Sequence, residues 1–206
     1  MTSEKRSTLI QKDIPIKGCK AIALGISTGG PLTLQKILPM ISEKVNVPIL
    51  IVQHMPPKFT KSLAERLNSL SKLEVKEAEN EEALKAGVVY IAPGGFHMKL
   101  DKVGLNNIKI NITREPADSL HRPSVDVMMN SVIDVFGKFT LGIIMTGMGK
   151  DGFEAVKKLK GLGGYCIAQN EETCVVYGMP KTIVDADLAD LVLPAEKIPE
   201  AINGII

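Results

Sequence analysis

Three side chains that together can cleave an ester follow predicted strands far apart in the chain. Ser27 and His54 each end a short apolar run, and Asp151 lies in a glycine-rich turn after a later run. A neutral imidazole can take the proton of a serine hydroxyl, and a carboxylate on the other ring nitrogen fixes the tautomer and stabilises the resulting cation. The three residue types therefore predict acyl transfer, provided that the fold brings them together.

The segments between these residues alternate between strand-like and helix-like patterns. Short apolar runs predict buried strands, and apolar residues at helical spacing predict helices between them. The predicted strands are 20–26, 48–52, 88–92, 140–145 and 165–168, and the predicted helices are 31–41, 59–70, 125–136, 154–160 and 195–205. This alternation predicts an α/β fold, a doubly wound, mostly parallel sheet with helices on both faces. Residues 97–102 and 108–113 predict an antiparallel hairpin at one edge.

Ligands of open parallel sheets bind outside the carboxyl ends of the strands, so the loops after the strands are where chemistry is expected. The segment from Gly25 to Gly29 matches the G-x-S-x-G pattern, which exposes a serine hydroxyl at a strand end. The order Ser, His, Asp differs from that of the α/β-hydrolase fold. Backbone N–H groups near Thr28 and in the turn 147–149 are candidates for binding a developing oxyanion.

Composition argues against several other classes of protein. The 25 basic and 23 acidic residues nearly balance, and with 4% aromatic residues and no Trp this disfavours nucleic-acid binding. No apolar run approaches the ~20 residues of a membrane span, so we expect a cytoplasmic protein that is not inserted in a membrane. Neither the cysteine nor the histidine spacing fits a metal site, and no cofactor is predicted. We expect a polar lead over residues 1–17 and one catalytic domain over 18–206.

Seven sequence blocks occur in the order found in a known family. They are GISTGG, VQHMPPKFTKSLAERLN, VKEAE, YIAPGGFHM, HRPSVD, TGMGKDG and IAQNEETCVVYGMP. On these blocks the chain resembles the catalytic domain of chemotaxis-receptor protein-glutamate methylesterases (CheB type). The resemblance implies hydrolysis of glutamate γ-methyl esters on helical segments of chemotaxis receptors, with release of methanol, and deamidation of receptor glutamines as a further activity.

The resemblance also implies roles for individual residues. Ser27 would be the nucleophile, His54 the base and Asp151 the carboxylate that orients it. Thr28 and the backbone of Met148 would line the oxyanion region. A substrate-facing role near the cleft would fall to His121 and Arg122.

Members of this family often carry an N-terminal phosphoacceptor receiver domain, which residues 1–17 are too few to form. We therefore expect either a stand-alone enzyme or a separate regulatory chain as partner.

Other interpretations of the same residues stay open at this point. A nucleotide-binding α/β module is one alternative, although Gly25, Gly29 and Gly30 do not give G-x-G-x-x-G spacing. A receptor-binding adaptor without activity is another. Asp151 could instead cap the helix that follows it, and His97 is expected to be structural or to line the cleft.

The basic residues after His54 also allow two interpretations. They lie on a helix face that solvent would normally cover, but they could attract acidic receptor helices. These residues are Lys58, Lys61 and Arg66.

Overall fold

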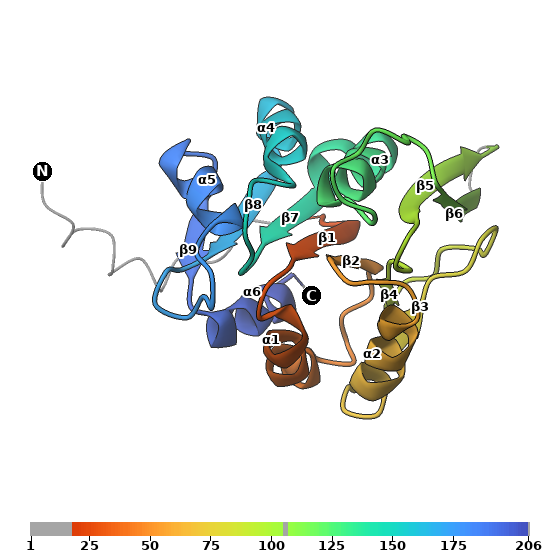
Figure 1. The fold of residues 1–206 in the computed structure, drawn as a ribbon, viewed down its shortest axis with the longest axis horizontal. Coiled ribbons are helices and arrows are strands. Elements are labelled where there is room, and N and C mark those ends of the chain that lie inside the picture. The colour runs from red at the N-terminus through yellow and green to blue at the C-terminus, as the bar shows by residue number, and fades with distance from the viewer. Residues whose placement is uncertain (1–17, 105–106, 206) are drawn as a thin grey trace, which may run out of the picture.

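The computed structural model describes residues 18–104 and 107–205, so the predicted polar lead over 1–17 lies outside the described residues. Seven parallel strands form the main sheet in the order β3-β4-β2-β1-β7-β8-β9 (Figure 1). Their bounds are β1 Ala21–Ile26, β2 Ile49–Gln53, β3 Glu74–Glu77, β4 Val88–Ile91, β7 Thr140–Ile144, β8 Tyr165–Gln169 and β9 Leu191–Leu193.

Helices cover both faces of this sheet (Figure 1). On one face lie α1 Gly30–Ile37, α2 Phe59–Asn68 and α6 Ile198–Asn203, and on the other lie α3 Val125–Phe136, α4 Phe153–Gly161 and α5 Met179–Asp185. Short 3-10 turns occur at Leu38–Met40, Gly137–Phe139 and Ala195–Lys197. The predicted fold class, an α/β protein with a doubly wound parallel sheet, is therefore confirmed.

The alternation of side chains along β1 sets how closely the two helical layers approach the sheet. Ile22, Leu24 and Ile26 belong to the core under α1, whereas Ala21 and Ala23 face the opposite core. Gly25 follows on this second face, where an added β-carbon would collide with the Val125 side chain. Small residues on one face of β1 thus let the N-terminus of α3 lie directly against the central strand.

The predicted hairpin is present as β5 His97–Val103 and β6 Asn107–Thr113, paired antiparallel. These two strands form a sheet of their own rather than continuing an edge of the main sheet. Leu100 N–H donates to Ser131 Oγ on α3 at 3.0 Å, so the hairpin is fixed to the helix beneath it. His97, the first residue of β5, is thereby brought close to the N-terminal half of α3.

Three elements were not predicted from the sequence. The edge strand β3 has the sequence EVKE with only Val75 buried, and the other edge strand, β9, has three residues. The third is α5, which begins at Met179. The predicted helix over 195–205 is a 3-10 turn followed by α6. Edge strands carry little of the apolar pattern on which sequence prediction depends.

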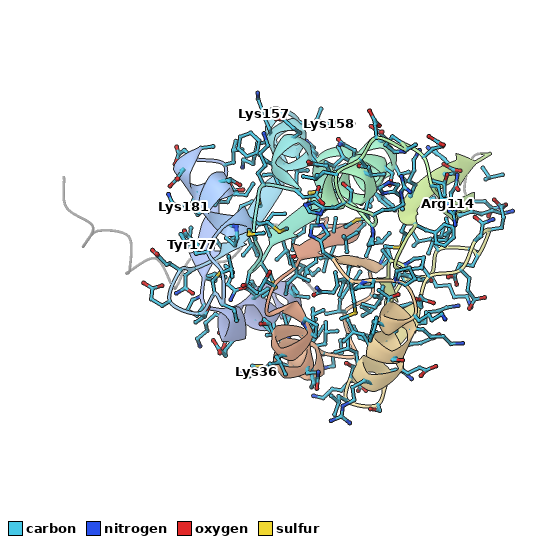
Figure 2. All side chains as sticks on the ribbon, in the orientation of Figure 1. Lys36, Arg114, Lys157, Lys158, Tyr177 and Lys181 are labelled. Carbon is cyan, nitrogen blue, oxygen red and sulfur yellow. The ribbon has the colours of Figure 1, made fainter. Side chains whose placement is uncertain are left out.

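Lysine side chains lie on the outer faces of the helices. Lys36 on α1, Lys157 and Lys158 on α4, and Lys181 on α5 project outward (Figure 2). The three cysteines are free; Cys166 is buried, and Cys19 and Cys174 are half-buried. No helix within the described ranges has the length and apolar character needed to cross a bilayer.

Candidate active site

Ser27 and His54 follow neighbouring strands at the centre of the sheet. β1 and β2 are in register with Ile26 opposite Gln53, so Ser27 and His54 come next on each strand. The His54 N–H donates to the Ile26 carbonyl at 3.2 Å, and the Ser27 N–H donates to the Thr146 carbonyl at 2.8 Å. Ser27 thus lies between the ends of β2 and β7, the strands on either side of β1. The chain forms β2, β3 and β4 on one side of β1 and β7, β8 and β9 on the other. This is the switch point where open α/β sheets bind ligands.

His54 is bonded to the predicted carboxylate across the sheet edge. His54 Nε2 lies 2.7 Å from Asp151 Oδ2, and both side chains are largely buried. Because a carboxylate only accepts, this bond assigns the neutral imidazole to the tautomer with its proton on Nε2. Nδ1 is then the ring atom whose lone pair is available as a base. The Ser27 hydroxyl makes no hydrogen bond within the described residues, and catalytic bonds are often long before substrate binds.

Asp151 is held by the N-terminus of a helix distant in sequence. Asp151 Oδ2 also accepts from Val125 N–H at 2.7 Å, and Oδ1 accepts from Asp126 N–H and Ser124 Oγ, both at 2.9 Å. Burial acts to raise the pKa of Asp151, but the bonds from His54 and from the α3 backbone outweigh it and leave that pKa below the ordinary carboxyl value. Asp151 is therefore an ionised carboxylate at the positive end of α3.

The alternative role considered for Asp151, capping the helix that follows it, does not match the structure. The N-cap of α4 is Gly152, without a side-chain cap bond. Instead, Asp126 in the first turn of α3 accepts from Ala155 N–H in α4 at 2.8 Å. Burial raises the pKa of Asp126. Asp126 of α3 thus accepts from the first turn of α4, and Asp151, in the turn just before α4, accepts from the first turn of α3.

His121 lies on the face of the proposed base. The rings of His121 and His54 are stacked, with centroids 4.2 Å apart and planes inclined by 23°. Burial, followed by the charge that His54 can carry, lowers the pKa of His121. Arg122, its neighbour, donates from Nη2 to the Ala117 carbonyl at 2.8 Å. The structure thus brings His121 to the base, whereas the Arg122 guanidinium bonds to its own loop.

His97 lies behind the site and is hydrogen-bonded to Ser124, one of the residues that hold Asp151. It is fully buried, and its Nδ1 accepts from the Ser124 N–H at 3.2 Å. Ser124 in turn caps α3 and donates to Asp151, so one chain of hydrogen bonds runs from His97 to His54. Burial is the largest cause of the lowered pKa of His97, and the positive charges of Arg122 and Lys99 act in the same direction, against the negative charge of Asp151. This places His97 in the structural role expected for it, beneath the site.

Two backbone N–H groups near Ser27 are available for an oxyanion. The Ser27 and Gly147 N–H groups are engaged, by the carbonyls of Thr146 and Val176 respectively. By contrast, the N–H groups of Thr28 and Met148 donate to no protein acceptor in the part of the chain that the structure describes. Gly147 lies against Ser27, since an added β-carbon would be 2.7 Å from Ser27 Cβ.

Other residues that shape these loops were missed in the sequence. Gln53 Nε2 donates to the carbonyls of Ser27 and His54, both at 3.0 Å. Thr146 Oγ1 donates to the Thr28 carbonyl at 2.8 Å and accepts from the Val176 N–H at 3.0 Å. The only sequence feature that could have indicated Gln53 and Thr146 is their position, because each lies where a buried strand ends and a loop begins. No group of three or more His, Cys, Asp or Glu residues among those described is arranged to hold a metal ion.

These features define a class: an α/β protein in which a serine, a histidine and an aspartate emerge at the carboxyl edge of one parallel sheet. The chain belongs to the CheB methylesterase family, whose family model matches residues 22–202. This membership favours the hydrolase interpretation over a nucleotide-binding module.

Individual relatives agree with this assignment. The chain is 47% identical over 205 residues to a protein-glutamate methylesterase/protein-glutamine glutaminase of Lawsonia intracellularis, covering 100% of this chain and 55% of the relative. A Thermotoga maritima protein of the same name is 46% identical, with 93% of this chain and 56% of the relative covered. The crystal structure of the Thermotoga maritima CheB methylesterase catalytic domain superposes with a TM-score of 0.87 at 45% identity, covering 91% of this chain and 98% of that one. The chain spans about half the length of the curated relatives it matches.

Proposed function

We propose that residues 18–206 form a catalytic domain that hydrolyses glutamate γ-methyl esters on chemotaxis receptors and releases methanol. The observation that carries the proposal is the bond from His54 Nε2 to Asp151 Oδ2, made by a histidine whose strand is in register with that of Ser27. The names of the relatives support the choice of substrate.

In the first half of the reaction, Ser27 Oγ attacks the ester carbonyl while Nδ1 of His54 takes the hydroxyl proton. Asp151 stabilises the imidazolium that forms. The N–H groups of Thr28 and Met148 bind the oxyanion of the tetrahedral intermediate. The bond to the methoxy oxygen then breaks, His54 protonates the leaving group, and methanol departs from an acyl-enzyme on Ser27.

Water completes the cycle. His54 removes a proton from a water molecule as it attacks the acyl carbonyl, and Ser27 Oγ leaves with that proton. The product is a free glutamate carboxylate. The same steps with a glutamine side chain would release ammonia, which is the glutaminase activity named for the relatives.

His121, stacked on His54, forms a wall of the proposed site, and its substrate-facing role belongs to this proposal together with that of Arg122. We further propose that the enzyme acts in the cytoplasm on the cytoplasmic part of its receptors, under the control of a regulatory partner.

Methanol release from receptor-containing membranes methylated in vitro tests the proposal. The wild-type chain should release methanol, and Ser27→Ala should release none while keeping the circular dichroism spectrum of the wild type. Equal release by both proteins would contradict the role given to Ser27. No release by the folded wild type would contradict the proposed function.

A further inference from the structure

The five most exposed large apolar side chains of the described residues all lie on one edge of the molecule. They are 60–91% exposed, and the other exposed large apolar residues are at most 51% exposed. Each stands in a loop or first helical turn at the carboxyl ends of the strands. We call Leu32, Phe59, Leu120, Met148 and Val175 the apolar rim.

Three members of the apolar rim are fixed to the proposed site itself. Leu120 precedes His121, whose ring is stacked on His54. Met148 follows Gly147, the residue that abuts Ser27. The Val175 side chain occupies the space where a β-carbon on Gly29 would lie.

Contacts between loops join the remaining members to the same edge. Leu32 lies in the first turn of α1, directly after the Ser27 loop. Phe59 begins α2, whose Thr60 Oγ1 accepts from Gly94 N–H at 2.9 Å. The Gly95 N–H donates to the Arg122 carbonyl at 3.2 Å, which ties this loop to that of Leu120.

Exposed apolar side chains gathered around a site mark an interaction surface. A methyl ester offers few atoms, so it supplies little binding energy by itself. An enzyme that draws on the non-reacting part of its substrate needs a surface beside the site to bind that part. The apolar rim is such a surface.

Two lysine side chains without ion-pair partners among the described residues lie beside part of this edge. Lys58 precedes Phe59, and Lys150 lies two residues after Met148; both are exposed, and neither forms an ion pair with a described residue. Near Val175, by contrast, the loop carries the exposed Glu171 and Glu172. The α2 and α4 side of the rim therefore suits a partner with apolar and acidic side chains together.

We propose that the apolar rim seats the amphipathic, acidic protein segment that carries the esterified glutamate, an inference that rests on the proposed function. Apolar side chains flanking the ester contact the rim, and acidic ones lie near Lys58 and Lys150. The apolar rim thereby recognises the protein segment, whereas the ester itself reacts at Ser27.

A triple variant tests this separation: Leu32→Ser, Phe59→Ser and Leu120→Ser, none of which belongs to the proposed catalytic machinery. The matched control is Leu70→Ser, Val103→Ser and Leu162→Ser, which removes apolar side chains that are 37–51% exposed away from this edge. Two rates are measured: methanol release from methylated receptors, and covalent labelling of Ser27 by a small fluorophosphonate. We expect kcat/KM for the receptor to fall about tenfold or more in the rim variant, chiefly through KM. Labelling should stay within about twofold of wild type, and the control should change neither rate.

Several results would overturn the proposal. Unchanged receptor kinetics in the rim variant would do so, as would an equal loss of labelling, which would mean that the rim supports the site. A wild-type dimer in sedimentation that the rim variant dissociates would assign the rim to a second copy of the chain. These outcomes are distinct from failure of the proposed function, in which the labelled, folded wild type releases no methanol from receptors at all.

Discussion

Asp126 and Asp151 exchange helix caps. Asp151, just before α4, accepts from two N–H groups in the first turn of α3, while Asp126 in that turn accepts from Ala155 N–H in α4. The orientation of the carboxylate that bonds His54 therefore depends on how α3 and α4 lie against each other. The same hydrogen bonds therefore stabilise the packing of α3 against α4 and orient Asp151 toward His54.

Asp126→Ala should destabilise the protein by about 1 kcal/mol, because it leaves the Ala155 N–H without its acceptor at a helix N-terminus. The control is Asp134→Ala on the same helix, which breaks only the exposed ion pair with Lys158 and should cost no more than about 0.5 kcal/mol. Urea unfolding measures both. Equal effects would mean that the exchanged cap contributes nothing particular.

Asp151→Asn should lower methanol release by on the order of 10³–10⁴-fold, because a neutral amide cannot stabilise the His54 cation, and an amide NH2 group turned toward Nε2 would favour the wrong imidazole tautomer. It should also alter the pH dependence of stability. The folded-state pKa of Asp151 is lowered, so its stabilising contribution is present above the ordinary value near 4 and is lost as the pH falls through the lower folded value.

Comparison of Asp151→Asn with Ser27→Ala separates these two effects. Thermal unfolding of Ser27→Ala should retain the wild-type dependence on pH, whereas that of Asp151→Asn should be flatter below about pH 4. An Asp151→Asn variant with wild-type activity would contradict the assigned role.

His97→Asn should leave the fold and most of the activity intact, since the amide oxygen of Asn can replace Nδ1 as the acceptor for the Ser124 N–H. It should make stability less sensitive to acid. The folded-state pKa of His97 is lowered, so the unfolded chain binds a proton first, and stability falls as the pH drops below the ordinary value near 6.5.

Melting temperatures across this range measure the difference between wild type and His97→Asn. His97→Leu, which removes the acceptor, should lower both stability and kcat. If His97→Leu and His97→Asn retain the same activity, His97 does not position Asp151 through Ser124.

Gly147→Ala should nearly abolish activity, because the new β-carbon would lie 2.7 Å from Ser27 Cβ and 2.5 Å from Met179 Sδ. Gly161→Ala is the control, since its β-carbon would meet nothing within 4 Å. Methanol release by each variant, beside its circular dichroism spectrum, checks the contrast. An active Gly147→Ala would show that the loop is free to move away from Ser27.

The sequence predicts the parts of this molecule that follow from local pattern. Apolar runs identify the central strands, and helical spacing identifies the helices between them. Ser27, His54 and Asp151 can then be found in the loops that follow those strands. The edge strands β3 and β9 are too short and polar to give such a signal.

The hydrogen bonds that hold the site residues in place cannot be predicted from local pattern. Capping rules relate a residue to its own helix, whereas Asp151 accepts from α3, 25 to 27 residues earlier in the chain. The bond from Ser124 to His97 likewise joins a loop to a hairpin that forms a sheet of its own. Such bonds depend on the packing of distant elements, so no single segment of sequence predicts them.

The most direct test of the account is covalent labelling of Ser27 by a fluorophosphonate, mapped by mass spectrometry in wild type and in His54→Gln. If the imidazole activates this hydroxyl, the wild type should carry one label, on Ser27, and His54→Gln should react at least about a hundredfold more slowly. A label on another residue, or equal rates in the two proteins, would contradict it.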